Sequence, residues 1–143
     1  MMTRQTHRIS LVLGLALLVT AAACGGGDTT GTTAVRVTDV TLGRAIGGDK
    51  AITDRTDSFK PNDTIYASIT TDGSASNTRL RARWTFEDGQ VVDESIQTIA
   101  PNIRERTEFH IAKPDGLPAG MYKLQVFLND QEAQTKDFEV KGS

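Results

Sequence analysis

The chain of 143 residues contains one cysteine, four prolines and only 6% aromatic residues. A single cysteine excludes a disulfide within the chain and a zinc site built from several thiolates. The chain has 16 basic and 18 acidic residues, so its composition does not indicate a nucleic-acid-binding protein. The scarcity of aromatic residues predicts a mainly aliphatic core. No apolar run reaches the roughly 20 residues that a transmembrane helix needs.

The longest apolar run lies near the N-terminus. Residues 9–23 carry no charge and follow a short basic segment that contains Arg4 and Arg8. Fifteen residues are too few for a typical membrane span but suit the apolar core of an export signal. The run ends in small residues directly before Cys24, as a signal peptidase requires. We therefore predict that residues 1–23 form a signal helix that is cleaved between Ala23 and Cys24.

The segment Ala21-Ala22-Ala23-Cys24 resembles the lipobox of bacterial lipoproteins, although that family prefers leucine where this chain has Ala21. The resemblance implies that Cys24 carries a covalent diacylglycerol and an N-acyl lipid, and no other cofactor is expected. It also implies a lipid anchor in the bacterial cell envelope. Gly25 in place of aspartate favours the outer membrane if the host has two membranes. The alternative is an ordinary secretory signal with Cys24 as a free thiol.

The next segment, residues 24–33, is rich in glycine and threonine and lacks large apolar residues. Such a segment cannot bury enough surface to become ordered, so we predict a flexible tether with a reach of roughly 15–18 Å. Loss of residues 1–23 leaves 120 of the 143 residues, with 14 basic and 18 acidic side chains and a net charge of −4. The remainder, residues 34–143, is expected to be a single domain.

From residue 34 onward, short stretches of alternating apolar and polar residues recur between turn signals, and no amphipathic helix is evident. The alternation changes parity near Thr38, which predicts a bulge. Trp84 belongs to an apolar row and is expected to be buried. We predict seven strands, at 34–42, 63–70, 78–86, 90–96, 104–112, 121–128 and 131–141. This number of short strands predicts an all-β, two-sheet antiparallel sandwich.

Three features resemble immunoglobulin-like and fibronectin-III-like domains, especially those on bacterial surface lipoproteins. They are the strand that contains Trp84, the Gly120-Met121-Tyr122 segment at the head of the sixth strand, and the closing Phe138-Glu139-Val140. The resemblance implies a seven-stranded immunoglobulin-like sandwich without the usual cysteine pair. It also implies that Tyr122 forms a hydrogen bond to the preceding corner of the chain.

Neither a catalytic nor a metal site is predicted. His110 alternates with Phe109 and Ile111, so it should point to solvent, and no partner nucleophile accompanies it. The long loop at 43–62 contains Asp49, Asp54 and Asp57, which leaves calcium as an alternative, but the spacing is not that of an EF-hand and basic residues intervene. Phe59 is expected to attach this loop to the core.

One face of the predicted sandwich carries a basic row formed by Arg79, Arg81 and Arg83. If the strands pair as in an immunoglobulin sheet, this row lies beside Lys123 and an outward-facing, exposed Phe127. These five residues are the predicted interface, and acids on the closing strand would offset part of the charge.

We therefore predict a non-enzymatic binding module, attached to a membrane by lipid, for an envelope protein or glycan and not for nucleic acid. One alternative is a module that binds a carbohydrate or an anionic ligand. That function would need a platform of exposed aromatic side chains. The other alternative is an enzyme inhibitor that acts through a projecting loop, at 43–62 or 113–120.

Overall fold

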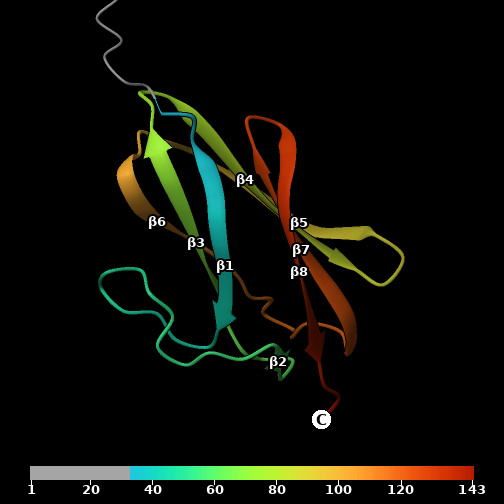
Figure 1. Cartoon of the computed structure of the whole chain (residues 1–143). Coiled ribbons are helices and arrows are strands. Elements are labelled where there is room, and N and C mark those ends of the chain that lie inside the picture. The colour runs from blue at the N-terminus through green and yellow to red at the C-terminus, as the bar shows by residue number, and fades with distance from the viewer. Residues whose placement is uncertain (1–32) are drawn as a thin grey trace, which may run out of the picture.

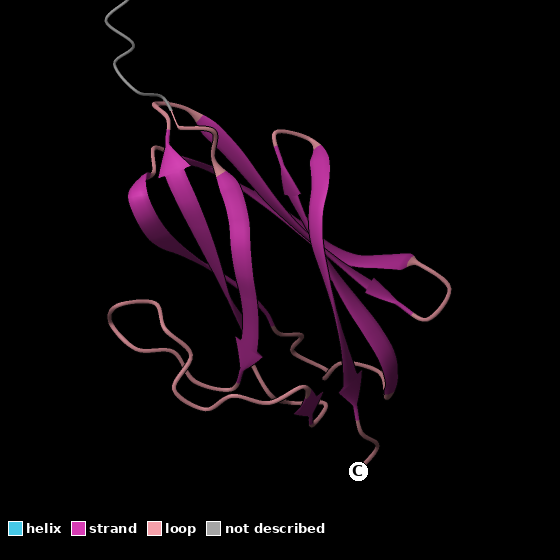
Figure 2. Ribbon diagram, in the orientation of Figure 1, coloured by secondary structure: helices cyan, strands magenta, loops and turns pink. Residues whose placement is uncertain are grey.

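The structure, a computed structural model, describes residues 33–143, and the predicted signal helix, the cleavage site and Cys24 lie outside the described residues. Figure 2 shows that the described part is built from strands and loops. The strands are β1 (Arg36–Gly43), β2 (Ser58–Phe59), β3 (Ile65–Ser74), β4 (Thr78–Phe86), β5 (Gln90–Ile99), β6 (Asn102–Ile111), β7 (Gly120–Leu128) and β8 (Gln131–Val140). The all-β prediction is confirmed for this part of the chain. Within residues 33–143, no helix is long and apolar enough to cross a membrane.

The strands form two sheets that pack face to face (Figure 1). One sheet has three strands in the order β1-β3-β6, and the other has five in the order β2-β8-β7-β4-β5. All neighbouring strands are antiparallel except β2 and β8, which are parallel. The free edges of the smaller sheet are β1 and β6, and those of the larger sheet are β2 and β5. The two-sheet sandwich is confirmed.

The predicted number of seven strands is wrong, because the described residues form eight. The additional strand is β2, which lies inside the predicted loop at 43–62 and pairs with the end of β8. The amide of Lys141 donates to the carbonyl of Phe59 at 2.9 Å, and the amide of Glu139 donates to that of Asp57 at 2.9 Å. Two residues are too few to produce an alternating pattern, so the sequence carried no sign of this strand.

The core lies between the sheets and is formed by alternate residues of the strands, as their pattern predicts. Trp84 is fully buried, and Phe59 is 1% exposed and fixes its loop as expected. The β1–β3 register shifts between Val37 and Asp39, which confirms the bulge. Tyr122 donates a hydrogen bond to the carbonyl oxygen of Pro118 at 2.7 Å, as the resemblance implied, and burial raises its pKa.

The segment between β1 and β2 is folded back on itself. Backbone hydrogen bonds join Arg44 to Asp54 and Gly47 to Ala51, and a bridge pairs Ile46 with Ile52. Lys50 lies at the tip with a positive φ of 61°. Its carbonyl oxygen accepts a hydrogen bond of 2.6 Å from the hydroxyl of Ser68 on β3. The tip is therefore held against the three-stranded sheet.

Candidate functional site

The predicted interface residues lie together on the outer face of the five-stranded sheet. β4 and β7 are neighbours, with Arg81 opposite Phe127 and Arg83 opposite Gln125. Lys123 faces Thr85 on β4 and Asp137 on β8. The expected pairing of these strands is therefore confirmed. The sheet brings together all five predicted residues, because alternate residues of adjacent antiparallel strands share a face.

The exposure predicted for Phe127 is wrong. Its ring points to the outer face, away from the core cluster, but only 8% of the residue is exposed. The guanidinium carbon of Arg81 lies 4.2 Å from the ring centroid, and that of Arg83 lies 5.2 Å away. A planar guanidinium stacks favourably on an aromatic face, so the two arginines cover the ring that the strand turns outward.

The basic row is largely matched by acidic side chains. Arg83 contacts Glu94 on β5 at 2.6 Å, and Arg79 contacts Asp130 in the β7–β8 turn at 3.2 Å. Arg81 lies 3.9 Å from the same carboxylate. The closing strand supplies an acid as predicted for Lys123, which lies 4.0 Å from Asp137 of β8. The acids that match the arginines come instead from β5 and from the β7–β8 turn. An anionic ligand would have to compete with these pairs.

The ion pair between Arg83 and Glu94 makes a measurable prediction. The hydrogen bond from Arg83 lowers the pKa of the Glu94 carboxyl below its ordinary value. We expect Arg83→Gln to raise this pKa, because the variant removes both the charge and the charged donor. A carboxyl-detected NMR titration of both proteins would measure the change. As a control, Arg36→Gln, on the other sheet, should leave the pKa of Glu94 unaltered; equal effects of both variants would contradict the assignment.

The alternative sites from the sequence are not assembled by the fold. Asp49, Asp54 and Asp57 pair separately with Arg106, Arg44 and Lys136, so the long loop does not bring them together. Within residues 33–143, no group of three or more metal-ligating side chains is present. His110 is exposed, as expected. It lies 3.3 Å from Glu108 and its ring is tilted against Tyr66.

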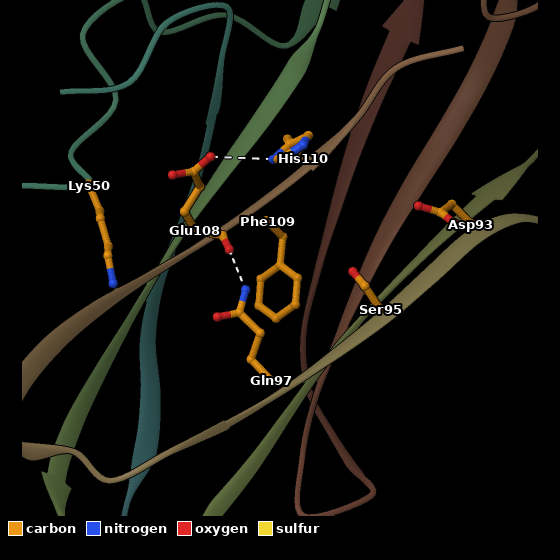
Figure 3. Close-up of a pocket in the computed structure, with 7 residues that line it drawn as sticks. All are labelled: Lys50, Asp93, Ser95, Gln97, Glu108, Phe109 and His110. Carbon is orange, nitrogen blue, oxygen red and sulfur yellow. Dashed lines mark hydrogen bonds and ion pairs between the residues drawn. The ribbon is translucent and has the colours of Figure 1, made fainter. Parts of the chain in front are cut away.

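A hollow that the sequence did not reveal lies between the free edges of β5 and β6. It has a volume of about 480 Å³ and is lined by polar groups from both strands and from the tip of the loop (Figure 3). The lining residues are Lys50, Asp93, Ser95, Gln97, Glu108, Phe109 and His110. Asp93, Ser95 and Gln97 pair with Trp84, Ala82 and Leu80 of β4 and so share the face that carries the core. Polar residues at these inward positions were the one signal in the sequence.

No protein-family model matches the sequence of this chain, and no curated protein sequence matches it. An immunoglobulin-like protein from Pseudomonas aeruginosa is similar over 78% of this chain and 99% of its own, with a TM-score of 0.54 and 18% identity. The C-terminal domain of wzt is similar over 78% of this chain and 74% of its own, with a TM-score of 0.54 and 8% identity.

A β-glucosidase from Listeria innocua is similar over 77% of this chain but only 16% of the enzyme, with a TM-score of 0.52 and 6% identity. Identities this low show a shared fold alone. The described residues therefore adopt an immunoglobulin-like β-sandwich, and the match to the glucosidase covers a small part of that enzyme.

Proposed function

We propose that this protein is a lipid-anchored module of the bacterial cell envelope whose sandwich binds a partner and catalyses no reaction. The anchor is supported by the small residues before Cys24 and by the uncharged run at 9–23 that precedes them. Two or three acyl chains on Cys24 would hold the chain on a membrane, since each buried methylene contributes about 0.8 kcal/mol. The proposed location is the envelope, and the outer membrane where the host has two.

The observation that carries the binding function is the composition of the outer face of the five-stranded sheet. In residues 33–143, four large apolar side chains are exposed, and three of them lie on this face: Val91, Ile96 and Met121. Ile96 pairs with Arg81, and Val91 and Met121 lie beyond the Arg83 end of the basic row. Methionine and arginine are enriched in protein interfaces, and clustered exposed apolar groups mark such surfaces.

A protein partner is favoured over a carbohydrate on this face. Sugar rings bind to exposed aromatic platforms, but Trp84 is fully buried and Phe127 is covered by two guanidinium groups. The ion pairs of the arginines argue in the same way against a free anion as the ligand. The mixture of paired charges and apolar groups matches the surface of another protein better.

Charge reversal at the rim of this face tests the interface. The full chain, purified in detergent, is used to capture proteins from envelope extracts, and the captured protein is compared between variants. We expect the double variant Arg79→Glu/Lys123→Glu to capture at least about tenfold less of the partner protein. Both side chains are half-exposed, and the new carboxylates would repel the acidic groups of a partner that binds the basic row. Lys113→Glu, in the loop after β6, is the matched control. Equal capture by all three proteins would rule out this face as the interface.

A further inference from the structure

Next to β6, the five-stranded sheet of the sandwich is wider than the three-stranded sheet that it covers. β5 is the free edge of the five-stranded sheet, and its inner face carries Asp93, Ser95 and Gln97 in place of core residues. These polar groups line the hollow together with the edge of β6 (Figure 3). The larger sheet therefore extends past the smaller one, and the space beside β6, where a fourth strand of the smaller sheet would lie, is open.

The free edge of β6 turns backbone groups that have no neighbouring strand toward this space. The side-chain amide of Gln97 donates a hydrogen bond of 2.6 Å to the backbone carbonyl of Glu108, where a neighbouring strand would place an N–H. The N–H and C=O of one residue in a strand point to the same side, so the amide of Glu108 also faces the hollow. The same holds for Arg106 and His110, which alternate with it. All ten residues of β6 lie opposite residues of β3 in the register of the sheet, and the residues between these three direct their backbone groups to β3.

A neighbouring part of β6 borders further open space. A second hollow of about 320 Å³ is lined by Gly48, Asp49, Lys50, Arg104, Glu105 and Arg106. Lys50, at the tip of the loop, lines both hollows. Together they follow β6 from Arg104 to His110, a length of roughly 20 Å at about 3.3 Å per residue. This track suits an extended segment of six or seven residues.

We propose that the free edge of β6 accepts an extended peptide strand of a partner protein, which adds a fourth strand to the three-stranded sheet under β5. Backbone hydrogen bonds to Arg106, Glu108 and His110 would supply the affinity, and the groups around the track would supply the selectivity. Ile103, 72% exposed at the start of β6, offers an apolar contact at one end. This site is separate from the outer face of the larger sheet, and it rests on the proposed function only in that both concern a binding module.

Charges indicate which peptide fits. Lys50 and Asp93 lie at opposite ends of the hollow in Figure 3, and neither has an ion-pair partner among the described residues. A strand with an acidic residue near Lys50 and a basic residue near Asp93 would pair with both. A second copy of this domain fits the site less well than a peptide does. If its β6 edge paired with that of the first copy, the β5 strands that extend past both edges would clash.

The test uses a displayed library of random ten-residue peptides, selected on the purified full chain in detergent micelles. We expect enriched peptides that alternate in polarity, carry both charge signs and lose binding when alternate backbone amides are N-methylated. Gln97→Ala should bind them about 2- to 10-fold more tightly, because it removes the side chain that competes for the carbonyl of Glu108. Thr98→Ala, on the outer face of β5, is the matched control and should bind with the affinity of the wild type.

A second variant removes the edge itself. Glu108→Pro deletes an amide that does not pair with β3, so the strand should persist and peptide binding should fall at least about tenfold. The proposal would be overturned if no peptide were enriched, if the enriched peptides tolerated N-methylation, or if Gln97→Ala and Glu108→Pro both bound them with the affinity of the wild type. A dimer in light scattering that Glu108→Pro dissociates would assign the edge to a second copy instead. Lipid labelling and face variants test the proposed function separately, so either can fail alone.

Discussion

Replacing Cys24 by alanine is expected to abolish incorporation of a fatty-acid analogue and to release the protein from the membrane fraction. The sulfur of Cys24 is the only thiol in the chain, so no other residue can accept the thioether-linked lipid. Without it, no acyl chain is present to bury methylenes in the bilayer. The domain at 34–143 is mildly acidic and would not bind an anionic membrane through charge. Metabolic labelling followed by fractionation of bacterial cells measures both effects.

A matched variant tests whether loss of the label follows from the missing thiol or from any substitution near the predicted cleavage site. Ala21→Leu restores the residue that the lipoprotein family prefers at this position, and labelling should be equal to or stronger than that of the wild type. Cys24→Ala and Ala21→Leu differ from the wild type by one side chain each, close to the predicted cleavage site. An unlabelled wild type would reject the anchor, and it would leave the ordinary secretory signal as the better interpretation of residues 1–23.

Replacing Phe138 by alanine is expected to cost about 3–5 kcal/mol of folding free energy. Phe138 joins the aromatic part of the core: its ring lies 5.2 Å from Tyr122, 5.7 Å from Phe59 and 5.8 Å from Trp84. Removing it leaves a cavity between both sheets that rigid strands cannot close. Small domains are stable by only about 5–15 kcal/mol, so the loss is a large part of the total. Chemical denaturation of the purified protein measures it.

The same substitution on the other face of the sheet is the control. Phe127→Ala also removes a buried phenyl ring, but the groups above that ring are the flexible guanidinium groups of Arg81 and Arg83. They can move into the vacated space, so we expect less than about half of the loss caused by Phe138→Ala. Equal losses would contradict the placement of Phe138 at the centre of the core and of Phe127 outside it.

Much of the sandwich could be predicted because most of the long strands carry their own alternation. The inward positions of β3 and β7, such as Ile69 and Leu124, are fully buried, as the pattern predicts. The two-residue turn at Asn129-Asp130 has the positive φ values, 49° and 68°, that a tight hairpin requires. These features depend on neighbouring residues, and local sequence therefore indicates them.

Features that depend on pairing between distant segments could not be predicted. β2 exists because Phe59 packs on Phe138 and its backbone bonds to the end of β8, about 80 residues later in the chain. The burial of Phe127 depends on arginines of β4, and the alternation of β7 shows only that this ring points outward. A short run and a single outward aromatic residue contain no information on what covers them.

The sequence by itself determined that the domain is built from strands and, for strands with a clear alternation such as β3, β4 and β7, which side chains face the core. It also contains the lipobox-like segment that ends at Cys24, on which the proposed anchor depends. Only the tertiary structure decided which strands lie at the edges, where arginines cover Phe127, and where β5 extends past β6 to leave a polar hollow. The physical reason is that alternation is a local property of the backbone, whereas the relative width of two packed sheets depends on long-range pairing.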